Sequence, residues 1–182
     1  MRDIKPINGR VFVERDPEEK ELMGFAVGDR AKVKSLMGTV VVSDTDIVAA
    51  GDRIHLPHQR AKTLDCVVDG RELTCVTEAD LFSVEKDGVL RPINRYLRVR
   101  KCENDHIRDE GGKVALYMTE NFIEETNWVE ILEIADDCEW VPPECTGWFA
   151  VAPKNDDKLQ RYGRTKDWFV HESLLKFITD GE

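Results

Sequence analysis

The feature that most constrains this chain is a short segment that occurs twice. Residues 4–15 read IKPINGRVFVER and residues 90–101 read LRPINRYLRVRK, and the two align position for position. In each copy, Pro-Ile-Asn precedes a stretch in which apolar residues alternate with larger or polar neighbours. The alternating apolar residues are Val11 and Val13 in the first copy and Leu97 and Val99 in the second. A period of two predicts a β-strand with one buried face, so we expect one such strand in each copy.

Two further blocks recur in the same order behind each copy. Residues 51–57 (GDRIHLP) match residues 147–153 (GWFAVAP), and residues 75–81 (CVTEADL) match residues 169–175 (FVHESLL). Three matching blocks in one order, with a longer middle in the second copy, indicate that a whole structural unit is duplicated. The chain is therefore predicted to hold two domains, residues 1–86 and 89–182, joined by a linker at residues 86–88.

Turn residues divide each half into short stretches with strand character. The predicted strands and hairpins are residues 38–42, 53–56, 64–76 and 81–84 in the first half and 128–134, 148–152, 159–170 and 174–178 in the second. Asp69-Gly70 is a two-residue hairpin turn. Pairing about it places one set of side chains on a single face, namely Leu64, Cys66, Leu73 and Cys75. Short strands at regular spacing predict an all-β fold in which each half is a barrel or a sandwich.

Each half also contains one long polar segment, residues 16–35 and residues 103–125. Each of these segments holds glycines and a small apolar island, which are Gly24 with Phe25, Ala26 and Val27, and Gly111 and Gly112 with Val114, Ala115 and Leu116. A loop of this length is uncommon in a compact domain unless it is functional or disordered. An apolar island among charges suits a segment that docks reversibly on a partner, and packing of the island under its own loop is the alternative.

The composition limits which partners the protein can bind and indicates its cellular compartment. The chain has 182 residues and a formal net charge of −10, which argues against binding to nucleic acid or to an anionic membrane surface. No apolar run is long enough to span a bilayer, and the N-terminus shows no signal or transit peptide. The five cysteines are scattered and odd in number, so we expect free thiols and a cytoplasmic location.

Several polar clusters are candidate metal or catalytic sites. The candidates are His55, His58, Cys66 and Cys75 as zinc ligands, Cys138 and Cys145 as a disulfide or metal pair, and His171, Glu172 and Ser173 as a catalytic group. The first set lacks a second close pair of ligands, and neighbours in an extended strand point to opposite faces. No glycine-rich phosphate loop is present. We therefore expect no metal, no cofactor and no enzymatic activity, and we interpret these residues as structural.

The four tryptophans, all in the second half, are interpreted as core, with an interface as the alternative.

Taken in order, these features resemble the GroES-like co-chaperonins. The resemblance lies in residues 4–16 (IKPINGRVFVERD), 51–56 (GDRIHL) and 75–84 (CVTEADLFSV), and again in 90–100 (LRPINRYLRVR), 110–116 (EGGKVAL) and 169–178 (FVHESLLKFI). Because the set occurs twice, the chain looks most like the chloroplast-type double co-chaperonin. Met23 stands where the family has a first glycine, Lys113 separates the second glycine pair from its apolar run, and the connector at residues 44–50 is short for the family's roof hairpin.

The resemblance implies two tandem GroES-like β-barrels, each with a long mobile loop, in a homo-oligomer that caps a GroEL-like chaperonin ring. It implies that the loops bind this partner, through Gly24, Phe25, Ala26 and Val27 in the first and Gly111, Gly112, Val114, Ala115 and Leu116 in the second. ATP would be hydrolysed by the partner. The alternative hypothesis is an assembly or structural protein, for example of a virus particle, that uses the duplicated barrel without binding a chaperonin. Alcohol dehydrogenases contain a related barrel but add a nucleotide domain that this chain lacks.

Overall fold

The computed structural model describes residues 5–17, 21–22, 25–26, 35–57, 62–102, 126–153, 160–161 and 167–180. The chain divides into two compact units, Met1–Leu90 and Arg91–Glu182. The described residues of both are strands joined by turns and short 3-10 helices, with no α-helix among them. The all-β fold predicted from the sequence is therefore confirmed. None of the helices in these ranges is long and apolar enough to cross a bilayer.

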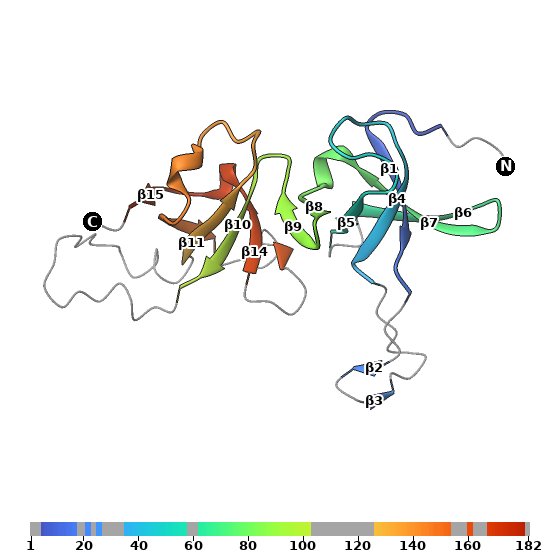
Figure 1. The fold of residues 1–182 in the computed structure, drawn as a ribbon, viewed down its shortest axis with the longest axis horizontal. Coiled ribbons are helices and arrows are strands. Elements are labelled where there is room, and N and C mark those ends of the chain that lie inside the picture. The colour runs from blue at the N-terminus through green and yellow to red at the C-terminus, as the bar shows by residue number, and fades with distance from the viewer. Residues whose placement is uncertain are drawn as a thin grey trace, which may run out of the picture. The chain divides into compact units, whose positions relative to one another are not determined.

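The first unit is built on a seven-stranded antiparallel sheet (Figure 1). In sheet order its strands are β6 (Thr63–Val68), β7 (Arg71–Thr77), β1 (Arg10–Arg15), β4 (Met37–Ser43), β5 (Arg53–His55), β8 (Ser83–Lys86) and β9 (Val89–Pro92). The first strand of the sequence, β1, lies in the middle of this order and pairs with both β4 and β7. A separate two-stranded sheet consists of β2 (Glu21–Leu22) and β3 (Phe25–Ala26).

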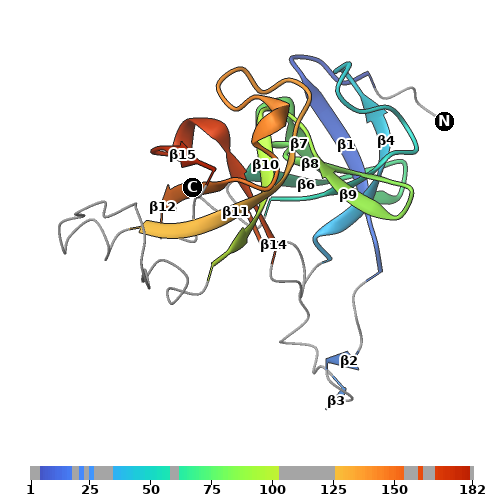
Figure 2. The ribbon, with the colours of Figure 1, turned by 60° about the vertical axis from the view of Figure 1, so that its left-hand side comes forward.

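The second unit is built on a six-stranded sheet with the same plan, and Figure 2 shows its long, curved strand β11. In sheet order its strands are β13 (Gln160–Arg161), β14 (Asp167–His171), β10 (Tyr96–Lys101), β11 (Thr126–Ile134), β12 (Phe149–Pro153) and β15 (Ile178–Thr179). As in the first unit, the repeated strand, β10, pairs with two neighbours. Within the described residues the end strands of each sheet do not pair with each other, so both barrel-like sheets are open.

The duplication extends to individual hydrogen bonds. The backbone N–H of Glu78 donates to the carbonyl of Gly9 at 2.7 Å, and that of Glu172 donates to the carbonyl of Arg95 at 3.0 Å. Asn8 and Asn94, which precede these two acceptors, share a φ of 58°. The strand register also shifts at the same place, between Phe12 and Val13 in β1 and between Arg98 and Val99 in β10. A bulge is a specific local feature, so its recurrence shows that the two halves repeat in three dimensions.

The predicted alternation determines which side chains form the core. Val11, Val13, Leu97 and Val99 are all fully buried. In the second unit, Leu97 and Val99 join a cluster that includes Val129, Ile131 and Val170, against which Trp148 and Trp168 pack. Trp128 stacks edge to face on Phe177, with ring centroids 5.2 Å apart. Trp140 is different, because it remains 61% exposed. The core interpretation therefore holds only in part: Trp148 and Trp168 are partly buried against the core cluster, and Trp128 is partly buried against Phe177.

Two Asp-Gly pairs form tight turns, and only one of them was predicted. Asp69 and Gly70 have φ values of 49° and 79° and connect β6 to β7, as expected of this hairpin. Asp87 and Gly88 have φ values of 55° and 74° and connect β8 to β9 in the same way. Residues 86–88, which were interpreted as a linker, thus include the turn of a β-hairpin. The same turn chemistry operates at both places, since two successive residues with positive φ reverse a twisted ribbon.

Gly38 allows β1 and β4 to approach closely where the first long segment returns to the sheet. A Cβ atom at this position would lie 2.6 Å from Cγ1 of Val13 and 2.7 Å from the carbonyl oxygen of Glu14. Replacing Gly38 by alanine should therefore force the two strands apart and destabilise the first unit by about 2 kcal/mol, the usual cost of overpacking. Thermal denaturation followed by circular dichroism measures this, with Thr39→Ala as the control. A variant that melts with the wild type would contradict the close packing.

Candidate docking segments and their anchoring

The structure places two of the predicted docking residues in a short hairpin. Phe25 and Ala26 form β3, which pairs with β2 so that Leu22 faces Phe25 and Glu21 faces Ala26. The segment expected to be an irregular loop thus contains regular backbone pairing. The other predicted docking residues lie outside the described residues: Gly24, Val27, Gly111, Gly112, Val114, Ala115 and Leu116. Docking by either segment stays a prediction.

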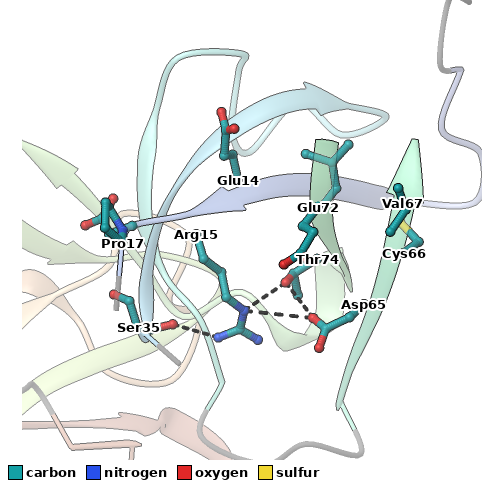
Figure 3. A pocket seen from close by; sticks show the side chains of 11 residues that line it. Glu14, Arg15, Pro17, Ser35, Asp65, Cys66, Val67, Glu72 and Thr74 are labelled. Atoms are coloured by element: carbon teal, nitrogen blue, oxygen red, sulfur yellow. Dashed lines mark hydrogen bonds and ion pairs between the residues drawn. The ribbon is translucent and has the colours of Figure 1, made fainter. Parts of the chain in front are cut away.

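The base of the first segment is fixed by Arg15, the last residue of β1. Its Nη1 donates to the carbonyl oxygen of Ser35 at 2.7 Å, and its Nε donates to Oγ1 of Thr74 at 2.8 Å. Thr74 in turn donates its hydroxyl hydrogen to Asp65 at 2.7 Å. Figure 3 shows the guanidinium reaching across a cavity of about 520 Å³ between β1 and the β6–β7 hairpin. Arg15, which immediately precedes the segment, thus contacts both Ser35 at the end of the segment and Thr74 in the neighbouring hairpin.

Asp16, the next residue, is held from the opposite side. Its backbone N–H donates to the carbonyl of Met37 at 2.9 Å. Both of its carboxylate oxygens accept from Arg53 of β5, at 3.2 and 2.7 Å, and the same arginine donates to Glu85 at 3.1 Å. A two-pronged arginine–carboxylate pair restricts orientation as well as distance. The segment therefore leaves the sheet from two consecutive residues whose side chains are both fixed.

The base of the second segment is held by different chemistry. Lys101, the last residue of β10, places its ammonium 4.0 Å from the ring centroid of Trp168. The preceding residue, Arg100, donates to Asp167 of β14 at 3.0–3.1 Å. Cys102 donates its backbone N–H to the carbonyl of Trp128 at 2.9 Å, which keeps the entry to the segment against β11. Cation–π attraction is strongest over tryptophan, so this arrangement also anchors a cation.

Sequence inspection missed the buried carboxylate of Glu172. The residue is 2% exposed and pairs with Nε of Arg95 at 2.5 Å. Its oxygens also accept three backbone N–H groups of the connector between β11 and β12, from Glu139 at 3.1 Å, Trp140 at 2.8 Å and Val141 at 3.2 Å. Burial alone would raise the pKa of Glu172, but these donors outweigh burial and hold the pKa below its ordinary value. Glu172 thus fastens the connector of the second unit to the end of β14.

The hydrogen bond between His171 and Ser173 has a structural explanation. Their Nδ1 and Oγ atoms are 2.8 Å apart, because residues 172–174 form a 3-10 helix and not the extended strand that was expected. His171 caps this helix by accepting the backbone N–H of Ser173 at 3.2 Å. Glu172 points away into the Arg95 pair, so it does not orient the histidine. In the matching turn of the first unit, Thr77 donates its hydroxyl hydrogen to Asp80 at 2.6 Å, and its side chain does not cap the backbone.

The cysteines and the candidate zinc ligands are structural in character. All five cysteines are free. Burial, followed by Glu172 and Asp137, raises the pKa of the Cys138 thiol to about 12, so this thiol is protonated at neutral pH and unreactive. Among the described residues, no three His, Cys, Asp or Glu side chains gather closely enough to hold a metal ion. His58 lies outside those residues.

Comparison with known proteins identifies the family to which the chain belongs. Residues 3–85 match the model of the family described as "Chaperonin 10 Kd subunit". The chain is also 30% identical over 91 residues to a protein named "Co-chaperonin GroES" from Oenococcus oeni, an alignment that covers 44% of this chain and 98% of that protein. This chain therefore belongs to the chaperonin 10 family. The family consists of co-chaperonins, which are not enzymes, in agreement with the expectation from the sequence.

Proposed function

We propose that this protein is a co-chaperonin that caps a GroEL-like chaperonin ring while the partner hydrolyses ATP and folds a client protein. The observation that carries the proposal is the alignment with a co-chaperonin over 98% of that relative's length. The docking element is the first segment, in which Phe25, Ala26 and Val27 bind the partner. Val114, Ala115 and Leu116 act in the same way in the second segment.

The proposed docking mode follows from the size of the motif. Three apolar residues bury little area, so one segment binds weakly and reversibly. A homo-oligomer presents several segments to a ring at once, and the effective concentration of the later contacts then raises the total affinity. The hairpin of β2 and β3 favours this mode, since it presents Phe25 and Ala26 on paired backbone between the two ends that Arg15 holds together. Some of the ordering cost of docking is thereby met before the partner arrives.

We further propose that the second half is a second co-chaperonin domain, so that each chain contributes two docking segments, as in a double co-chaperonin. The domain boundaries are those of the sequence repeat, residues 1–86 and 89–182. The support is the repetition of hydrogen bonds and of the strand bulge in both halves. Each chain would then bring two segments to the ring, which doubles the number of weak contacts per chain.

The direct test is capture of the protein on a purified GroEL-type ring in the presence of ATP or ADP, compared with the ring alone. We expect retention with nucleotide, release when nucleotide is removed, and inhibition of the ring's ATP turnover or rescue of a denatured client. Size-exclusion chromatography with light scattering gives the oligomeric state in parallel. An oligomer that neither binds the ring nor assists refolding would overturn the proposal and favour an assembly role.

A further inference from the structure

The two units place a cation at the same point and hold it on the same neighbouring strand. Arg15 in β1 and Lys101 in β10 are equivalent in the repeat, and each is the last residue of the strand that leads to a long segment. The strand registers make their partners equivalent as well. Val13 faces Thr74 in the first unit, and Val99 faces Trp168 in the second. Arg15 donates to Thr74, whereas Lys101 lies over Trp168. Different side chains thus make the same connection.

The contacts of Arg15 are not those of a stabilising surface ion pair. Its side chain is 16% exposed, and the carboxylate that pairs with it among the described residues, that of Asp65, lies 3.9 Å from its Nε. Its two hydrogen bonds go to neutral oxygens, a threonine hydroxyl and a serine carbonyl. Burial of a guanidinium without a close carboxylate has an electrostatic cost. This cost is offset by a structural role, because Arg15 connects both ends of the segment to the β6–β7 hairpin (Figure 3).

We propose that Arg15 and Lys101 are positioning residues for docking. Neither touches the partner. Each fixes the start of its segment against the adjacent strand, so that the apolar motif leaves the unit in one direction, and Arg15 also closes the base of its segment through Ser35. The inference rests on the proposed function and extends it, since it assigns part of the docking affinity to residues outside the motif. The Met37 backbone N–H, which donates to Oγ of Ser35 at 3.1 Å, belongs to the closed base of the first segment and reports on it.

The consequence of losing the connection is a change in docking and not in folding. Without Arg15, Ser35 is released from β1, and the segment samples more conformations in the free protein. The loss of conformational entropy on docking is then larger. We expect about a threefold loss of affinity for each altered segment, and about a tenfold loss or more for a ring in which several segments act together. The pairing of β1 with β4 is retained, because Asp16 still donates to Met37.

The test compares Arg15→Gln, Lys101→Gln and the double variant with wild type. Arg71→Gln is the matched control, since this arginine lies on the same hairpin but pairs with Glu14 at 2.6 Å and contacts neither Ser35 nor Thr74. Three quantities are measured for each protein: the dissociation constant for an ATP-loaded GroEL-type ring, the melting temperature, and the hydrogen-exchange rate of the Met37 amide.

We expect Arg15→Gln to weaken docking and to speed exchange at Met37 while the melting temperature stays within a few degrees of wild type, because the loss of two hydrogen bonds to neutral oxygens is offset by removal of the cost of burying the guanidinium. Lys101→Gln should weaken docking without affecting Met37, and the double variant should lose the most. Arg71→Gln should bind as wild type does. Equal affinity of Arg15→Gln and wild type overturns the positioning role. Failure of wild type itself to bind the ring contradicts the proposed function instead, and the two outcomes are therefore distinct.

Discussion

Replacing Phe25 by aspartate should abolish binding to a chaperonin ring and leave the melting temperature unchanged. Phe25 lies in β3, whose strand pairing is confined to β2 in a sheet separate from the seven-stranded one. Burying a phenylalanine side chain in a partner's groove contributes about 1.5–3 kcal/mol. An aspartate in its place loses this contribution and adds a charge that would have to be desolvated. Since a ring repeats the loss at every copy of the segment, binding should fall below detection.

The control for charge is Leu64→Asp, which makes the same change at another apolar residue of the first unit. Leu64 is 65% exposed on the edge strand β6, outside the proposed docking segment. This variant should bind the ring as wild type does. Val114→Asp tests the second segment, where Lys113 interrupts the family pattern, and should have the smaller effect. A fall of many degrees in the melting temperature of Phe25→Asp would show that Phe25 belongs to a folded core, and the docking assignment would be abandoned.

The features that local sequence determines were predictable. Alternation placed Val11, Val13, Leu97 and Val99 in the core, because a strand with one buried face has a period of two. The Asp69-Gly70 pair gave both the hairpin and its register, with Cys66 opposite Leu73 and Leu64 opposite Cys75. The repeat supplied the rest, since each strand identified in one half located its counterpart in the other.

The features that depend on contacts distant in sequence were not predictable. In the sequence, Glu172 is one member of a turn motif that occurs in both halves. In the structure, its ion-pair partner is Arg95, which lies 77 residues away. Arg15 looked like the end of an amphipathic strand, yet its partners are Ser35 and Thr74. No pattern within a window of sequence reveals which distant acceptor a long side chain reaches. The repeat did contain one signal: Gly9 in the first copy is replaced by Arg95 in the second, at a position with a φ of 62° in both.

The second large effect concerns Glu172, whose replacement by glutamine should destabilise the second unit by about 3 kcal/mol, because a buried ion pair is broken and backbone N–H groups lose their acceptor. A glutamine of the same shape has one carbonyl oxygen, while its amide group faces N–H donors of the connector. For a unit of this size the loss corresponds to a fall in melting temperature of about 10–20 °C. Tryptophan fluorescence isolates the effect, since all four tryptophans lie in the second half.

The same residue predicts how the second unit responds to acid. The pKa of Glu172 is lower in the folded protein than its ordinary value of 4.5, so its contribution is fully present at neutral pH and is lost as the pH falls below about 4.5 and through the folded-state pKa. Between pH 5 and pH 3, the free energy of unfolding of Glu172→Gln should therefore fall less than that of wild type. Tryptophan fluorescence measures both values. Glu78→Gln, at the matching position of the first unit, is the control and should leave the tryptophan transition in place. Parallel acid profiles for wild type and Glu172→Gln would show that the pKa of Glu172 is the same in the folded and the unfolded chain, and would contradict its stabilisation by Arg95 and the connector N–H groups.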